Sequence, residues 1–268
     1  VRKRDDFVMT SNLLSTVIED CYLLLIVPES SREMKLQALC SLGLLTGKSS
    51  KDLLECFLQS ADIILEDIVL SSNNSNHSIK LHDYVMCLQQ IILDLYFSFG
   101  GDGGSGAISS FKASFLSELN MHIKCEMFDS QKALNLGSLG DLTLRGIFDP
   151  WLGKVLKKAS LLTYKALGHL DSAVEVSRLQ YEVWKTSTYK ASQRKKTREY
   201  SLLDWREASV ALLGPLSTKQ ISAKKSFLGN LVGTNESHMD NATDGESLLW
   251  SLLRAPFVTH AERLLRSS

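Results

Sequence analysis

The chain has 268 residues, of which 44% are hydrophobic and 22% are charged. This composition is close to the globular average and argues against wholesale disorder, and the length allows either two packed units or one elongated rod. Lysine plus arginine and aspartate plus glutamate number 30 each, so the net charge is zero. Zero net charge provides no overall field to attract nucleic acid or an anionic membrane, and any such contact must come from a local patch.

The cysteines are odd in number and widely spaced, without a C-x-x-C pair (Cys21, Cys40, Cys56, Cys87 and Cys125). This spacing favours a reducing compartment. Four N-x-[ST] sequences would accept glycans in a secreted chain, but they lie in two polar loops where Asn and Ser gather anyway, which is the favoured explanation (Asn73, Asn76, Asn235 and Asn241). No signal peptide is visible in Val1–Asp6, and the apolar run Cys21–Val27 is too short to span a bilayer. Because the chain starts with Val rather than Met, we expect it to be a fragment of a longer protein. A signal peptide upstream of Val1 therefore stays an open alternative.

Apolar residues near the start of the chain show helical spacing. From Leu14 they fall at positions 14, 17, 18, 21, 24 and 25, which form one face of a helix that Pro28 ends. Ser30 and Glu33 match the S-x-x-E capping box of a second helix. We expect this helix to end at Gly47, which can adopt the left-handed conformation of a helix terminator.

A third helix, capped by Ser49 or Ser50, has a well-defined amphipathic pattern. Its apolar stripe requires a neighbouring element, because only burial releases the roughly 1.5–3 kcal/mol available per large side chain (Leu54, Phe57, Leu58, Ala61, Ile64, Leu65 and Ile68). After a polar loop at 71–78, a fourth helix repeats the pattern from Leu81 to Leu95. The sequence therefore predicts an N-terminal helical bundle over residues 1–99.

Residues 100–110 are predicted to form a linker or hinge, because their many glycines prevent regular structure. A fifth helix is expected over 111–127, whereas 129–146 shows no clear period. Asp149-Pro150 predicts the start of a further helix to about Gly168, since Asp is a favourable N-cap and Pro suits the first helical position.

A longer helix is expected from Asp171 to about Arg198, and a short one around Trp205 that ends at Gly214-Pro215. A polar, mobile loop at 233–245 and a last helical pair bent at Pro256 complete a C-terminal helical region over 111–268. No run of alternating β-branched residues is bounded by turn signals, so the sequence predicts no sizeable sheet. The predicted fold is all-α, an elongated bundle or rod of antiparallel helices.

Two glycine motifs resemble nucleotide-binding loops but lack the required context. Gly47-Lys48-Ser49 looks like the end of a P-loop, yet Gly43 is one residue too close and a helix precedes it. Gly101–Gly106 satisfies G-x-G-x-x-G, yet neither the preceding strand nor the following helix of a dinucleotide site fits. A helix-to-helix turn and a flexible linker are therefore the favoured interpretations.

The sequence carries no reaction motif. The six histidines are scattered, no serine lies in a G-x-S-x-G elbow, and spacing pairs no cysteine with a histidine. We therefore expect a chain that is not an enzyme and needs no cofactor, metal or small-molecule substrate. An active site assembled from distant residues stays open, and it would show a deep pocket with convergent polar groups.

A basic segment with tyrosines nearby marks the second half of the long helix (Lys185, Lys190, Arg194, Lys195, Lys196 and Arg198). It could contact phospholipid head groups or an acidic partner, although a solvated helix end is favoured and nucleic acid is not expected. Trp184, Trp205 and Trp250 stand within apolar helical patterns, which indicates core packing. An exposed tryptophan would instead mark a partner surface.

Two leucine-rich stretches resemble the first subunit of the conserved oligomeric Golgi complex, a vesicle tether whose subunits are largely helical rods. Leu36–Leu70 is a leucine-rich helix, a Gly-Lys-Ser-Ser turn and a Leu-Leu-x-x-Phe-Leu helix. Leu248–Arg266 reads Leu-Trp-x-Leu-Leu, then Phe257, then Arg263-Leu264-Leu265. The two stretches cover about a fifth of the chain, and Ala61-Asp62 replaces an arginine expected in the family.

The resemblance implies a non-enzymatic scaffold subunit that acts in intra-Golgi and retrograde vesicle transport. It implies a cytoplasmic, peripheral Golgi membrane location and contacts with sister subunits and trafficking factors. The alternative is a helical adaptor or repeat scaffold outside Golgi traffic, which regularly stacked helix pairs with a concave binding face would distinguish.

Two sets of residues follow from these interpretations. We expect packing or partner binding at four apolar residues (Leu54, Phe57, Leu58 and Trp250). Membrane or acidic-partner contact is expected at four basic residues (Arg194, Lys195, Lys196 and Arg198).

Overall fold

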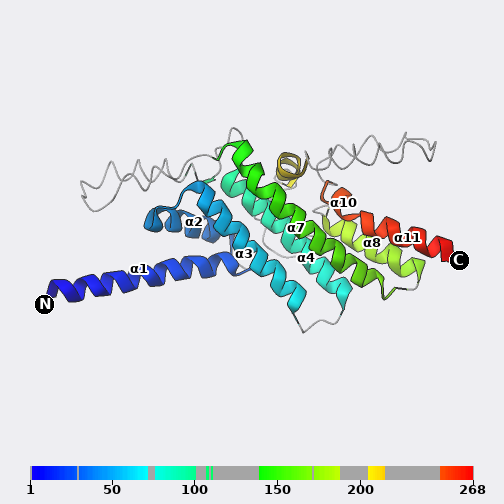
Figure 1. The fold of residues 1–268 in the computed structure, drawn as a ribbon, viewed down its shortest axis with the longest axis horizontal. Helices are drawn as coiled ribbons and strands as arrows, with labels where there is room; N and C mark the ends of the chain where they lie inside the picture. The colour runs from blue at the N-terminus through cyan, green and yellow to red at the C-terminus, as the bar shows by residue number, and fades with distance from the viewer. Residues whose placement is uncertain are drawn as a thin grey trace. The chain divides into compact units, whose positions relative to one another are not determined.

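The structure is a computed structural model. It describes residues 2–28, 30–71, 76–100, 107–108, 110, 139–170, 172–187, 205–214 and 248–267. Every regular element in these ranges is a helix (Figure 1), so the predicted all-α class is confirmed for the part of the chain that is described.

The chain divides into two compact units that do not follow its linear order. Unit 1 comprises Val1–Glu66 and Asp94–Ile147, and unit 2 comprises Asp67–Leu93 and Phe148–Ser268. The prediction from sequence was a division into 1–99, a linker at 100–110, and 111–268. The units differ from it because three long helices each contribute residues to both: α3 (Ser50–Leu70), α4 (His77–Phe99) and α7 (Asp141–Leu167).

In unit 1, α1 (Arg2–Ile26) packs against α2 (Arg32–Thr46). The first helix ends two residues before Pro28, as predicted from the missing N–H of proline. Burial begins only at Cys21, because Leu14 and Val17 of the same apolar stripe are exposed. The N-terminal half of this stripe is therefore only partly covered by the described residues.

The N-cap of α2 is Ser31 rather than the predicted Ser30. The Ser31 Oγ accepts a hydrogen bond from the Met34 N–H at 3.2 Å, and its extended backbone places its carbonyl to accept from the Lys35 N–H at 3.0 Å. Both serines precede a glutamate within the first turn, so the sequence pattern misplaced the cap by one residue. The backbone conformation of Ser31 decides the choice.

The turn from α2 to α3 uses the signals that the sequence predicts. Gly47 has a φ of 71°, and its N–H donates to the Gly43 carbonyl at 2.9 Å, which ends α2. Ser49 caps α3, because its Oγ accepts from the Asp52 N–H at 3.2 Å while the Asp52 carboxylate accepts from the Ser49 N–H at 3.0 Å. This reciprocal pair is a capping box.

The core of unit 1 gathers around the first half of α3. The rings of Phe57 and Phe99 lie 6.2 Å apart, and six large apolar side chains of α3 are buried, four of them in its first half (Leu53, Leu54, Phe57, Leu58, Ile64 and Leu65). Within this core, Lys35 Nζ lies 2.9 Å from Asp94 Oδ2. The two side chains are only 7% and 2% exposed, so α2 and the end of α4 share a buried ion pair.

In unit 2, the first part of α4 packs with the second part of α7. The Tyr84 hydroxyl donates to the Val155 carbonyl at 3.2 Å, and both residues are fully buried. Next along the chain comes α8 (Ala173–Ser187), which contacts α10 (Leu248–Leu253) and α11 (Ala255–Ser267), as Figure 1 shows. Trp205 is fully buried in a helical segment at 205–214, as its pattern predicts.

The start of α7 is a further correction. The helix begins at Asp141 and contains Pro150, whereas Asp149-Pro150 predicted the start and 129–146 was expected to be irregular. Its buried side chains continue upstream at helical spacing, with Leu144 and Phe148 before the proline and Leu152 after it. Because Pro150 itself is exposed, its ring lies on the outside of the helix and one hydrogen bond is lost.

The remaining predicted boundaries agree where they can be compared. The Ser172 Oγ accepts from the Val174 N–H at 3.3 Å and caps α8. The last pair of helices breaks at Arg254, with Pro256 in the first turn of α11. The expected helix at 111–127, the second half of the long helix (188–198) and the loop at 233–245 lie outside the described residues.

Candidate functional site

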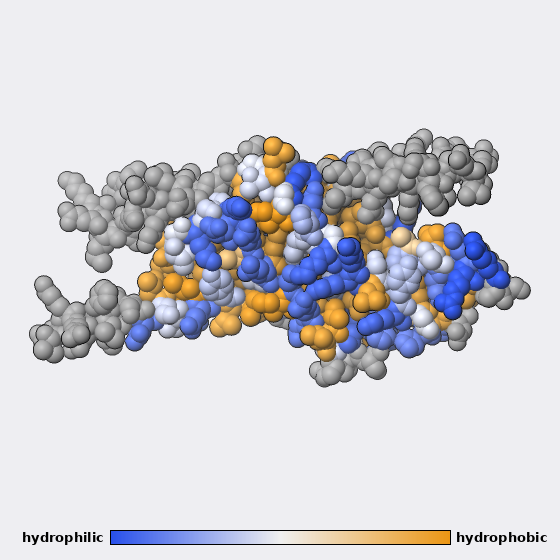
Figure 2. Space-filling model, in the orientation of Figure 1, coloured by the Kyte–Doolittle hydropathy of each residue, from blue (hydrophilic) through white to orange (hydrophobic). Residues whose placement is uncertain are grey.

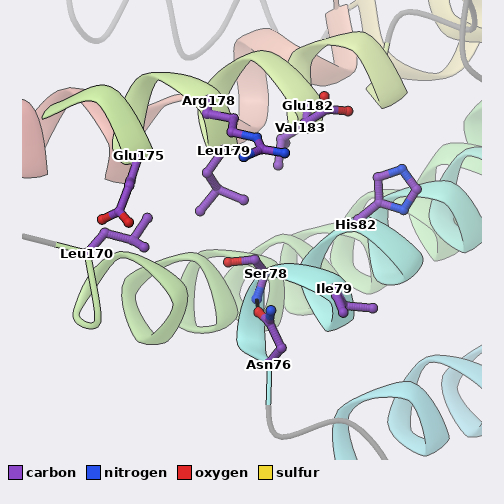
Figure 3. A pocket seen from close by; sticks show the side chains of 10 residues that line it. All are labelled: Asn76, Ser78, Ile79, His82, Leu170, Glu175, Arg178, Leu179, Glu182 and Val183. Atoms are coloured by element: carbon purple, nitrogen blue, oxygen red, sulfur yellow. Dashed lines mark hydrogen bonds between the residues drawn. The ribbon is translucent and has the colours of Figure 1, made fainter. Parts of the chain in front are cut away.

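An open pocket of about 480 Å³ lies in unit 2 (Figure 3). Its lining comes from the start of α4, from Leu170 in the turn after α7, and from α8 (Asn76, Ser78, Ile79, His82, Leu170, Glu175, Arg178, Leu179, Glu182 and Val183). Apolar side chains of α8 and Leu170 form the floor, and charged side chains of α8 stand at the edge. An apolar floor with a few charged groups is typical of ligand-binding sites and active sites alike.

Helix caps hold both walls of this pocket. The Asn76 Oδ1 accepts from the Ser78 N–H at 2.9 Å and starts α4, while Ser172 starts α8. Leu179 and Val183 of α8 are buried, so this helix is anchored along one face and presents the other. The caps thus fix the backbone positions from which the polar side chains of the lining project.

The charges at the pocket are mixed in sign. Among the described residues Glu175, Arg178 and Glu182 form no ion pair, and the His82 Nδ1 lies 3.5 Å from Asp83 Oδ1. Ser78 and His82 are one helical turn apart, but no hydrogen bond joins the hydroxyl to the ring in the described part of the chain. His82 therefore does not activate the Ser78 hydroxyl in this arrangement, and no group of three metal-binding side chains occurs within the described ranges.

Beside the pocket, two histidine rings stack. The rings of His77 and His169 lie 5.4 Å apart and within 7° of parallel. Burial lowers the pKa of His77, and the nearby His169, Lys165 and Lys80 lower it further. The pair comes from the start of α4 and the end of α7, a proximity that sequence spacing could not indicate.

The P-loop-like lysine has a structural role. Lys48 Nζ lies 3.0 Å from the Cys56 Sγ and 5.5 Å from the centre of the Tyr22 ring. Its contacts with Tyr22 and Cys56 raise the pKa of Lys48, so it stays charged. Gly47 ends one helix and Ser49 begins the next, which makes this segment the helix-to-helix turn favoured from the sequence.

The four apolar residues singled out from the sequence occupy two places. Leu54, Phe57 and Leu58 are buried in α3. Trp250 is half-buried in α10, with its ring 5.6 Å from that of Phe257. The four basic residues Arg194, Lys195, Lys196 and Arg198 lie outside the described residues.

Sequence reasoning missed the exposed aromatic face of α8. Trp184 was expected in the core, but it is 36% exposed and its ring lies 5.7 Å from that of Tyr181, which is 54% exposed. The signal was present in the helical spacing, because the buried residues 176, 179 and 183 place position 184 at the edge of the opposite face. Figure 2 shows hydrophobic residues interrupting the hydrophilic surface at several places on the visible face.

The regular elements of the described residues are helices throughout, and unit 2 contains an open pocket. No family model, no curated protein and no solved structure matches the chain. No described helix is both long enough and apolar enough to cross a bilayer.

Proposed function

We propose that the chain is a non-enzymatic helical scaffold subunit of a Golgi vesicle-tethering complex, acting in intra-Golgi and retrograde transport. The observation that carries the proposal is that successive helices bury apolar stripes, while the described residues assemble no cluster of metal-binding side chains. The two stretches that resemble the tethering family are pairs of consecutive helices joined by short turns, α2 with α3 and α10 with α11.

Burial assigns roles within this scaffold. Leu54, Phe57 and Leu58 act as internal packing anchors, because none of them reaches the surface. Partner contact falls instead to exposed apolar side chains, and α1 carries a group of these at Leu13, Leu14 and Val17. An exposed apolar stripe on a long helix suits the helix-to-helix packing by which rod-like subunits assemble.

Affinity capture of the tagged full chain from cells tests the proposal. We expect sister subunits of the tethering complex to co-purify, and the variant Leu14→Glu/Val17→Glu to recover much less of them. Ser15→Ala, a change of an exposed polar residue in the same helix, is the matched control. If the folded wild-type chain recovers no tethering subunit, the proposal is wrong, and recovery of another defined assembly would favour the helical-adaptor alternative.

Peripheral membrane attachment is part of the same proposal and is assigned to Arg194, Lys195, Lys196 and Arg198. Four positive charges within five residues suit anionic lipid head groups, each contributing about 1 kcal/mol near the surface. Replacing all four by alanine should lower the Golgi-bound fraction of the chain. An unchanged Golgi-bound fraction would remove this role from the basic segment.

A further inference from the structure

The exposed face of α8 has the composition of a protein interface. Val174, Tyr181 and Trp184 are 76%, 54% and 36% exposed. Arg178 is also exposed, and Lys185 Nζ lies 5.8 Å from the centre of the Tyr181 ring. Tyrosine, tryptophan and arginine are the residues that contribute most often to binding energy at interfaces. The opposite face of α8 is buried, and α8 contacts α10 and α11.

One flank of this face carries charges of alternating sign. Glu175, Arg178, Glu182 and Lys185 follow one another at intervals of three, four and three residues, which keeps them on one side of a helix. Figure 3 shows the first three projecting from α8 beside the pocket. Within the described ranges Glu175, Arg178 and Glu182 have no ion-pair partner.

Reversing the order of these four charges inverts the sign at every position, so the row is complementary to the same row running in the opposite direction. Read from the N-terminus it is negative, positive, negative, positive, and read backwards it is positive, negative, positive, negative. In an antiparallel pair of identical helices centred near Gln180, Glu175 faces Lys185 of the second copy. Arg178 then faces Glu182 of that copy, and two-fold symmetry forms each of these pairs twice. In a parallel, in-register pair the two charged flanks would instead lie on opposite sides of the interface and could not face each other.

We propose that this chain self-associates as a two-fold symmetric dimer through the exposed face of α8, with antiparallel helices. The aromatic pair Tyr181 and Trp184 supplies the apolar centre, and the charged flank sets direction and register. This dimer does not depend on the proposed tethering function. A 15-residue helix is about 22 Å long, so a contact confined to α8 is small and the dimer is weak, with a Kd on the order of 10–100 µM.

A charge-swap experiment on the full chain tests the dimer. One variant, Arg178→Glu/Lys185→Glu, makes the row wholly acidic, and the other, Glu175→Lys/Glu182→Lys, makes it wholly basic. Sedimentation equilibrium from about 5 to 500 µM should show self-association of the wild type. Each variant alone should associate at least about tenfold more weakly, because every pair then joins like charges. An equimolar mixture should restore association, since all facing charges are then opposite.

The mixture also separates loss of the interface from loss of folding, because only folded variants can restore each other. Circular dichroism of each variant should match the wild type, since the buried face of α8 is unchanged. A wild-type chain that is monomeric at the highest concentration would overturn the proposal. So would variants that dimerise as well as the wild type, or a mixture that remains monomeric.

Discussion

Lys35 and Asp94 form a buried ion pair between residues 59 positions apart in the chain. Removing one partner leaves the other charge buried without its opposite charge, so Asp94→Asn or Lys35→Met should lower the free energy of unfolding by about 3–5 kcal/mol. The double variant Lys35→Met/Asp94→Leu should lose less than either single change, because no buried charge remains. Urea unfolding measures all three.

The exposed pair of Lys51 and Glu55 provides the control for this prediction. Their charged atoms lie 4.0 Å apart, and the side chains are 58% and 45% exposed. Lys51→Met should therefore change the free energy of unfolding by only about 0–1 kcal/mol. A similar loss for Lys51→Met and Asp94→Asn would show that burial does not govern the Lys35–Asp94 interaction.

His77 links stability to pH. Burial, together with His169, Lys165 and Lys80, lowers the pKa of His77 below its ordinary value of about 6.5. At a pH above that value, the His77 ring is neutral in both the folded and the unfolded chain. As the pH falls through the ordinary pKa, His77 binds a proton in the unfolded chain before it does so in the folded chain. The folded state therefore loses stability relative to the unfolded state. Stability should fall as the pH is lowered from about 7 to about 5, and His77→Gln should reduce that fall. An NMR titration midpoint of His77 at or above the ordinary value would contradict this.

At the scale of the element, helix ends show how closely local sequence determines structure. Gly47 and Ser49 act as predicted, because a left-handed glycine and a capping box depend on residues within one turn. The cap of α2 is shifted by one residue to Ser31, since two adjacent serines offer equivalent patterns. Only the backbone angles distinguish between them.

The two serines give a matched test of the cap of α2. Ser31→Ala should lower the free energy of unfolding by about 1 kcal/mol, because the Met34 N–H loses its acceptor. Ser30→Ala should have a smaller effect, since the Ser30 Oγ has no hydrogen-bond partner among the described residues. Thermal unfolding of both variants measures the difference. A larger loss for Ser30→Ala would restore the position predicted from the sequence.

At the scale of the whole molecule, continuous helices connect the two units. Because α3, α4 and α7 each contribute residues to both, unfolding one unit interrupts helices of the other. We therefore expect the chain to unfold in one cooperative transition. All four tryptophans belong to unit 2, so tryptophan emission reports on that unit alone.

A cavity in unit 1 tests this coupling. Leu54 is fully buried there, and Leu54→Ala should cost about 2–5 kcal/mol. If the units unfold together, the variant shifts the tryptophan transition by the same amount as the circular dichroism transition. Leu88→Ala, a similar buried change in unit 2, is the control and should shift both signals in either case. A tryptophan transition that Leu54→Ala leaves unmoved would show independent units.

The sequence by itself determined the all-α class, the buried stripe of α3 and several helix ends, because these depend on residues a few positions apart. It could not determine that α7 continues through Pro150, because burial of Leu144 and Phe148 against distant residues outweighs one lost hydrogen bond. The Lys35–Asp94 pair, the pocket and the exposed face of α8 were decided by tertiary structure. Each requires knowing which helix faces meet, and periodicity shows only that a face exists.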